Sequence, residues 1–102
     1  MAYKVEFLPD AKADFDRLDG SLKKLATKQI DKIRENPELE EPLGKRHDMD
    51  LSGFRKLYFS KRQYRLVYEI QENITTVLIV GIGKREKLEI YQMVAQRTGR
   101  QR

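Results

Sequence analysis

Lysines, arginines and tyrosines near the ends of predicted strands are the side chains of this sequence whose types and spacing could do chemistry. Lys56 and Tyr58 are two residues apart and therefore share one face of a strand. Arg65 begins the next predicted strand, Arg85 follows the last one, and Tyr91 stands one to two helical turns further on. Guanidinium groups bind phosphate oxygens through a planar fork, and aromatic rings stack on bases. The set predicts a site for an RNA phosphodiester and its neighbouring base.

Other kinds of active site are poorly supported by this sequence. The chain has one histidine, His47, and no cysteine, so neither a zinc site nor thiol or Ser-His-Asp catalysis is indicated. Gly81 and Gly83 alone do not make a phosphate-binding P-loop. We therefore predict neither a metal nor a cofactor.

The formal net charge of +5 is unevenly distributed along the chain. Residues 45–65 carry seven lysines and arginines against two acidic residues, and residues 84–102 carry six against two. Two basic segments thus flank an almost uncharged strand region, which favours a polyanion such as nucleic acid, with a solvated surface as the simpler alternative. The further residues predicted to contact RNA are Lys45, Arg46, Arg55, Tyr58, Lys61, Arg62 and Lys84.

The N-terminal third of the chain predicts a strand and two helices. Apolar and charged residues alternate over 3–7, as in a strand with one buried face. Pro9 suits the first turn of a helix, and Ser21 can cap a second helix. Pro37 follows the end of that helix, because the residue before a proline is disfavoured in helical conformation.

Residues 37–53 contain two prolines and two glycines without periodicity, which predicts a long basic loop. A helix over about 87–98 and a basic tail over about 98–102 end the chain, with Gly99 as a suitable residue after the helix. Between loop and helix we expect three strands with connections short enough for antiparallel hairpins, at 54–60, 64–71 and 74–82.

The predicted order is β-α-α-β-β-β-α, an α+β fold in which an antiparallel meander sheet is covered by two N-terminal helices and one C-terminal helix. At 102 residues we expect a single domain over residues 1–102. The absence of cysteine favours a reducing compartment, and no apolar run approaches the ~18 residues of a membrane span. We therefore expect a cytoplasmic protein that does not bind membranes.

Two stretches, YRLVYEI (64–70) and VGIGKREKLEIY (80–91), closely resemble the RelE family of bacterial toxins. The similarity in element order extends over essentially the whole chain, from Ala2 to about Arg97. The resemblance implies a RelE-like fold of the microbial-ribonuclease type. It also implies a toxin of a type II toxin–antitoxin system that cleaves mRNA on the ribosome.

The same resemblance implies roles for individual residues. Arg65, Arg85 and Tyr91 match the family residues that act on the scissile phosphate and the flanking base. Two family lysines one pleat apart fall on Lys56 and Tyr58, so the second position departs from the pattern. A shift of one residue in this hairpin selects Arg55 instead.

The implied reaction is independent of metal. A ribose 2′-hydroxyl attacks the adjacent phosphorus and expels the 5′-oxygen of the next nucleotide, which leaves a 2′,3′-cyclic phosphate. Arg65 is assigned to phosphate stabilisation, and Arg85 to the phosphate or the leaving group. Tyr91 is assigned to base stacking or orientation, while Lys56 is either the base or an electrostatic residue.

The expected partners are mRNA, the ribosome with its RNA, and a cognate antitoxin whose acidic, partly disordered segment wraps the basic face. Two alternatives remain open. One is a ParE-like toxin that shares the fold but inhibits DNA gyrase without nuclease chemistry. The other is a homologue that binds RNA or the ribosome without catalysis.

Overall fold

The structure is a computed structural model that describes residues 2–46, 49–84 and 89–98, without the side chains of residues 45, 46, 49, 50 and 89. Over these residues the chain forms β-strands, α-helices and two short 3₁₀ helices (η). Their order is β1 (Lys4–Phe7), α1 (Pro9–Asp16), α2 (Gly20–Glu35), η1 (Pro37–Leu39), β2 (Glu41–Arg46), β3 (Met49–Phe59), β4 (Tyr64–Gln71), η2 (Glu72–Ile74), β5 (Thr76–Lys84) and α3 (Glu89–Thr98). None of the described helices is long and apolar enough to cross a membrane.

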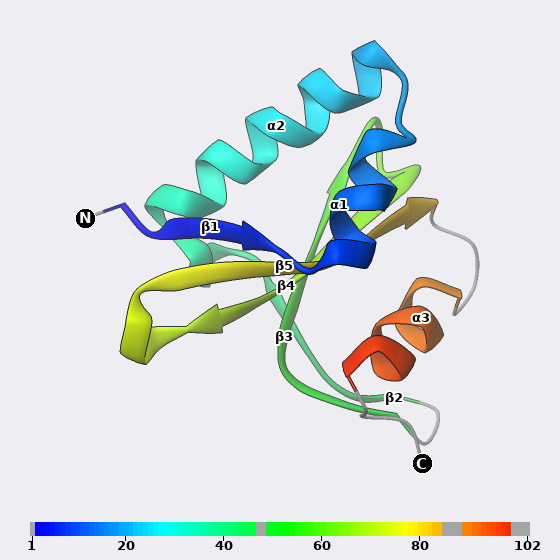
Figure 1. Cartoon of the computed structure of the whole chain (residues 1–102). Coiled ribbons are helices and arrows are strands. Elements are labelled where there is room, and N and C mark those ends of the chain that lie inside the picture. The colour runs from blue at the N-terminus through cyan, green and yellow to red at the C-terminus, as the bar shows by residue number, and fades with distance from the viewer. Residues whose placement is uncertain (1, 47–48, 85–88, 99–102) are drawn as a thin grey trace.

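One mixed sheet carries the five strands in the order β1-β5-β4-β3-β2 (Figure 1). Strands β2 to β5 form an antiparallel meander, which confirms that part of the prediction. Strand β1 adds to β5 in parallel, a pairing that no hairpin could make. The last strand of the chain, β5, is therefore the sheet neighbour of the first, β1, although α1, α2 and three other strands separate them in the sequence.

The prediction of a loop over residues 37–53 is wrong for most of that segment. Strand β2 lies within it, and β3 begins at Met49, ahead of the predicted start at residue 54. A register shift lies between Pro42 and Gly44, and Gly44 and Gly53 have φ angles of 120° and 91°. These irregularities interrupt the alternation that identifies a strand, and the edge position of β2 tolerates the proline.

The cap of α2 also differs from the prediction. Its N-cap is Asp19 rather than Ser21, and the Asp19 carboxylate accepts a hydrogen bond of 2.9 Å from the backbone N–H of Leu22. This hydrogen bond, with a second one from the Ser21 hydroxyl, holds the pKa of Asp19 below its ordinary value. A carboxylate at an N-cap satisfies one of the free N–H groups of the first turn, whereas Ser21 already lies within the helix.

The later boundaries agree with the prediction to within a few residues. Strand β4 has the predicted bounds, and β5 begins at Thr76 because the residues before it form η2 and a left-handed turn at Thr75, with φ 51°. Helix α3 begins at Glu89, while the predicted helical residues 87 and 88 lie outside the described residues. The predicted cap Gly99 and the tail beyond it lie outside them too.

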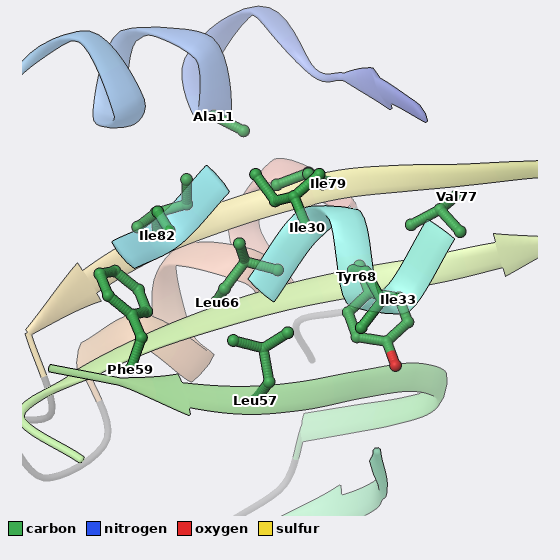
Figure 2. Close-up of a cluster of buried hydrophobic side chains, with 11 residues drawn as sticks. Ala11, Ile30, Ile33, Leu57, Phe59, Leu66, Tyr68, Val77, Ile79 and Ile82 are labelled. Carbon is green, nitrogen blue, oxygen red and sulfur yellow. The ribbon is translucent and has the colours of Figure 1, made fainter. Parts of the chain in front are cut away.

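Helices cover both faces of the sheet. On one face α1 and α2 contribute Ala11, Ala26, Ile30 and Ile33, which pack against β3, β4 and β5 (Figure 2). The sheet residues of this cluster are Leu57, Phe59, Leu66, Tyr68, Val77, Ile79 and Ile82. The opposite face packs against α3 through Leu51, Phe54, Val67, Val80, Ile90, Tyr91, Val94 and Ala95. Strand β5 is therefore buried on both sides, as its apolar sequence predicts.

The free edge of β5 is closed by an ion pair between the first and last helices. Strand β1 pairs with β5 only as far as Ile79. Beyond that point the backbone N–H of Ile82 donates to the Asp14 carboxylate at 3.2 Å, and Arg97 donates to the carbonyl of Val80 at 3.0 Å. Arg97 also donates to Asp14 at 2.7 Å, so one buried pair covers an unpaired strand edge and ties α3 to α1.

Candidate functional site

The predicted site residues on β3 and β4 project from the sheet face that α3 covers. Tyr58 and Arg65 are direct cross-strand partners, and Lys56 is paired with Val67. Val67 packs against α3, and side chains alternate along a strand, so Lys56, Tyr58 and Arg65 share its face. The alternation of YRLVYEIQ places Arg65 there because Leu66 and Tyr68 face the other core.

Tyrosine rings surround the two cations of this group. The guanidinium carbon of Arg65 lies 4.7 Å from the ring centre of Tyr91 and 5.5 Å from that of Tyr58. The ammonium of Lys56 lies 5.3 Å and 6.0 Å from the same Tyr58 and Tyr91 rings. Lys56 Nζ also donates a hydrogen bond of 3.1 Å to the Tyr58 hydroxyl. Two sheet cations and two rings thus form one compact group.

The cations of this group are buried. Lys56 and Arg65 are each 8% exposed, and Tyr91 is 2% exposed. Burying a charge is costly unless partners compensate for the lost water. The negative faces of the rings do so, at about 0.5–2 kcal/mol for each contact, and Glu41 adds a carboxylate oxygen 3.8 Å from Lys56 Nζ. The side chains are therefore held in place before any substrate binds.

The turn between β3 and β4 adds a third cation. Arg62 is exposed, and its guanidinium carbon lies 4.0 Å from the ring centre of Tyr58. Ser60, Lys61 and Arg62 all have positive φ, at 53°, 55° and 65°. Side-chain-bearing residues adopt this left-handed conformation only at a cost. Contact with Tyr58 helps to hold Arg62 in this turn.

Arg55 and Lys84, two of the residues predicted to contact RNA, lie outside this group. Arg55 lies on β3 between Phe54 and Lys56 and so faces the other way, where it donates to the backbone carbonyls of Glu38 at 3.2 Å and Glu40 at 2.7 Å. It joins η1 to the sheet. Lys84 is exposed at the end of β5, opposite Tyr64.

The remaining predicted residues are described in part or not at all. Lys45 and Arg46 belong to β2, but their side chains lie outside the described part of the chain. Arg85 lies outside the described residues altogether. The structure thus brings together Lys56, Tyr58, Arg62, Arg65 and Tyr91 of the predicted set.

Glu41 is a site neighbour that the sequence did not reveal. It is the cross-strand partner of Lys56, yet it falls in the segment predicted as a loop. Only recognition of β2 could have placed it there. Within residues 2–46, 49–84 and 89–98, no group of three histidine, cysteine or acidic side chains is arranged to hold a metal ion.

Comparison with known families decides where this fold belongs. The family model of the ParE toxins of type II toxin–antitoxin systems (parDE) matches residues 5–89. The chain belongs to this toxin family. The match spans β1 to the start of α3 and so includes every strand of the sheet.

The toxin is also similar to individual RelE proteins, which confirms the resemblance to the RelE family. It is 27% identical to the mRNA interferase toxin RelE of Escherichia coli K12 over 100 residues, which cover 95% of this chain and 98% of the relative. A solved structure of an E. coli RelE double mutant in the free state matches with a TM-score of 0.76 and 26% identity, covering 95% of this chain and 98% of that one. The same mutant in complex with an antitoxin RelBc peptide matches with a TM-score of 0.71 and 26% identity, covering 90% and 93%.

Proposed function

We propose that this toxin is an endoribonuclease that cleaves mRNA on the ribosome. The observation that carries the proposal is the group of Lys56, Arg65, Tyr58 and Tyr91. Two buried cations on one sheet face lie beside the Tyr58 ring of the same face and the Tyr91 ring of α3. A relative of nearly the same length carries the name mRNA interferase, which supports the same activity.

The reaction is a transfer within the RNA chain. The 2′-oxygen of one ribose forms a bond to the adjacent phosphorus as its proton leaves, and the bond from phosphorus to the 5′-oxygen of the next nucleotide breaks. The leaving oxygen takes up a proton. The products are a 2′,3′-cyclic phosphate and a 5′-hydroxyl, and no metal takes part.

Arg65 is the residue that we assign to the scissile phosphate. Negative charge builds up on the phosphoryl oxygens in the transition state, and a fixed guanidinium group stabilises that charge without having to reorganise. Arg65 is fixed by Tyr91 on one element and Tyr58 on another. Arg85, six residues before Tyr91 in the chain, remains a proposed second phosphate or leaving-group contact.

Lys56 and Tyr58 form a hydrogen-bonded pair beside that phosphate. The ammonium of Lys56 adds a second positive charge and donates to the Tyr58 hydroxyl at 3.1 Å. Tyr58 thus occupies the second lysine position of the RelE pattern as a polar group coupled to a cation. Tyr91, at 2% exposure, supports Arg65 through its ring rather than offering a solvent-exposed face to a base.

The composition of this group supports a dependence on the ribosome. Arginine does not deprotonate in proteins, so the arginines of the group cannot relay a proton. Positioning of the mRNA by the ribosome can supply several kcal/mol of the barrier. Exposed cations such as Lys61 and Lys84 suit contacts with ribosomal RNA.

The partner that we propose is a cognate antitoxin with an acidic segment that covers the basic face. The complex of a structurally similar RelE mutant with an antitoxin RelBc peptide supports this assignment. An acidic segment would match the net charge of +5 and would gain order on binding.

Inhibition of DNA gyrase is the second candidate, because the matching family model is that of the ParE toxins. One experiment separates the two activities. The toxin is induced in cells, and the 5′ ends of mRNA are mapped for the wild type and for Arg65→Ala. Codon-phased cuts within reading frames that vanish in the variant are expected. Growth arrest with intact mRNA and broken DNA would instead indicate gyrase inhibition.

A further inference from the structure

Arg62 forms the outer layer of the aromatic group. Its guanidinium carbon lies 4.0 Å from the ring centre of Tyr58, which is van der Waals contact. The same ring lies 5.5 Å from the guanidinium carbon of Arg65, and Arg65 in turn contacts Tyr91 at 4.7 Å. The two arginines are thus joined through one ring.

The backbone of the turn presents Arg62 in this position. Ser60, Lys61 and Arg62 take left-handed φ angles of 53°, 55° and 65° in succession, although none of them is a glycine. Hairpins are more commonly connected by two-residue turns that contain glycine, which adopts positive φ angles without this cost. The contact with Tyr58 is an interaction that favours this turn.

Neither tyrosine of the group is well placed to receive a base. Tyr91 is 2% exposed. Tyr58 is half-buried, with the guanidinium of Arg62 over its ring. Arg62 itself is exposed, and a planar guanidinium group is a surface on which RNA bases stack.

We propose that Arg62, seated on Tyr58, is the stacking platform for a base next to the scissile phosphate. This inference rests on the proposed function and gives that site a base-binding residue. A phosphate held at Arg65 and a base held at Arg62 would both lie next to the Tyr58 ring, which suits neighbouring parts of one RNA strand. The role requires the plane of the guanidinium group and not only its charge.

The test pairs protein variants with altered RNA. Purified toxin is added to ribosomes carrying an mRNA with either an intact codon or a single abasic ribose immediately 5′ or 3′ of the scissile phosphate, and single-turnover cleavage rates are measured. For the wild type, removal of the base at one of these two positions is expected to slow cleavage at least about fivefold. Arg62→Ala and Arg62→Lys are expected to cleave intact mRNA more slowly by a similar factor and to show little further loss with the abasic mRNA.

Matched variants separate the contribution of the planar guanidinium group of Arg62 from that of positive charge in the turn and from that of the Tyr58 ring beneath it. Lys61→Ala removes one positive charge from the same turn and is expected to keep the full sensitivity to the missing base. Tyr58→Phe keeps the ring under Arg62 and is expected to keep that sensitivity, whereas Tyr58→Leu is expected to lose it.

Two outcomes would overturn the inference while leaving the proposed function intact. One is wild-type cleavage by Arg62→Lys, which would make Arg62 a simple phosphate cation. The other is an undiminished effect of the abasic ribose in Arg62→Ala. Failure of the wild-type toxin to cleave any ribosome-bound mRNA would instead refute the proposed function, and the inference with it.

Discussion

Tyr58 and Arg65 face each other across β3 and β4 as direct cross-strand partners, with the guanidinium carbon of Arg65 5.5 Å from the Tyr58 ring centre. In this pair Tyr58 stands at a position where the resemblance to the RelE family leads us to expect a lysine. The hydroxyl of Tyr58 accepts a hydrogen bond of 3.1 Å from Lys56 Nζ. The pair therefore joins Arg65, which we propose to bind the scissile phosphate, to Lys56 through one phenol.

We expect Tyr58→Phe to lower mRNA cleavage about ten- to a hundredfold, because a hydrogen bond with a charged partner is worth about 1.5–3 kcal/mol. Lys56→Met removes the cation as well and is expected to lower it further. The single-turnover cleavage rate on programmed ribosomes measures both. Lys28→Ala, an exposed change on α2, is the control for loss of positive charge. An unchanged rate for Tyr58→Phe would show that the hydroxyl takes no part.

The Asp14–Arg97 pair is expected to be a main determinant of stability. Asp14 is 4% exposed and accepts from Arg97, Arg17 and the backbone of Ile82. Breaking a buried pair by removing one charge costs about 3–5 kcal/mol, so Asp14→Asn should lower the free energy of unfolding by that order. Urea denaturation measures it.

An exposed pair on the same helix supplies the control for this prediction. Lys12 and Asp16 lie 2.6 Å apart, with both side chains 56% exposed. Exposed pairs contribute little, so Asp16→Asn should change the unfolding midpoint only slightly. Equal losses for Asp14→Asn and Asp16→Asn would contradict the role assigned to the buried pair.

Gly81 is expected to set how closely α3 approaches the sheet. A Cβ atom at this position would lie 3.0 Å from Cγ2 of Val94 and 3.3 Å from Cε of Met93, whereas one at Gly83 would meet Ile90 at an ordinary 3.6 Å. Gly81→Val should therefore destabilise the fold by about 1–3 kcal/mol and slow cleavage, because α3 carries Tyr91. Gly83→Ala should cost less stability. Thermal unfolding of the two variants would refute this account if it ranked them the other way.

Tyr68 is expected to contribute stability that is lost in alkali. Its hydroxyl donates a hydrogen bond of 2.6 Å to the carbonyl of Pro37, and burial raises its pKa above the ordinary value. The contribution is present below about pH 10, where the unfolded phenol is protonated, and falls as the pH rises further. Tyr68→Phe should cost about 1–3 kcal/mol at neutral pH and flatten the alkaline loss. Urea denaturation at a series of pH values from 8 upward measures this. If Tyr68→Phe lost free energy of unfolding with pH as steeply as the wild type, the phenol would not be responsible.

Local alternation predicted β4 and the part of β3 from residue 54 onward, the two strands that carry most of the candidate site. The pattern of YRLVYEIQ gave β4 its observed bounds, and the two-residue spacing of Lys56 and Tyr58 put both on one face. The same alternation turns Arg55 to the opposite face, where it donates to backbone carbonyls, and its contact with RNA stays a prediction.

Other features carried no local signal. Strand β2 was not predicted because the register shift between Pro42 and Gly44 interrupts its alternation, and the position of Glu41 beside Lys56 was missed with it. Asp14 and Arg97 are 83 residues apart, and no local sequence pattern around either residue predicts that the two form an ion pair. The contact of Arg62 with Tyr58 depends on three left-handed residues in a turn without glycine, which propensity does not predict.

The chemistry of the cut ends tests the central claim most directly. Purified toxin is incubated with ribosomes programmed with a defined mRNA, and the termini of the products are identified for the wild type and for Arg65→Ala. The account predicts a 2′,3′-cyclic phosphate and a 5′-hydroxyl at one position in the codon. It also predicts a rate at least about a hundredfold lower for the variant, since a fixed transition-state contact is lost. Intact mRNA with the wild type, products with 5′-phosphate ends, or full activity of Arg65→Ala would contradict it.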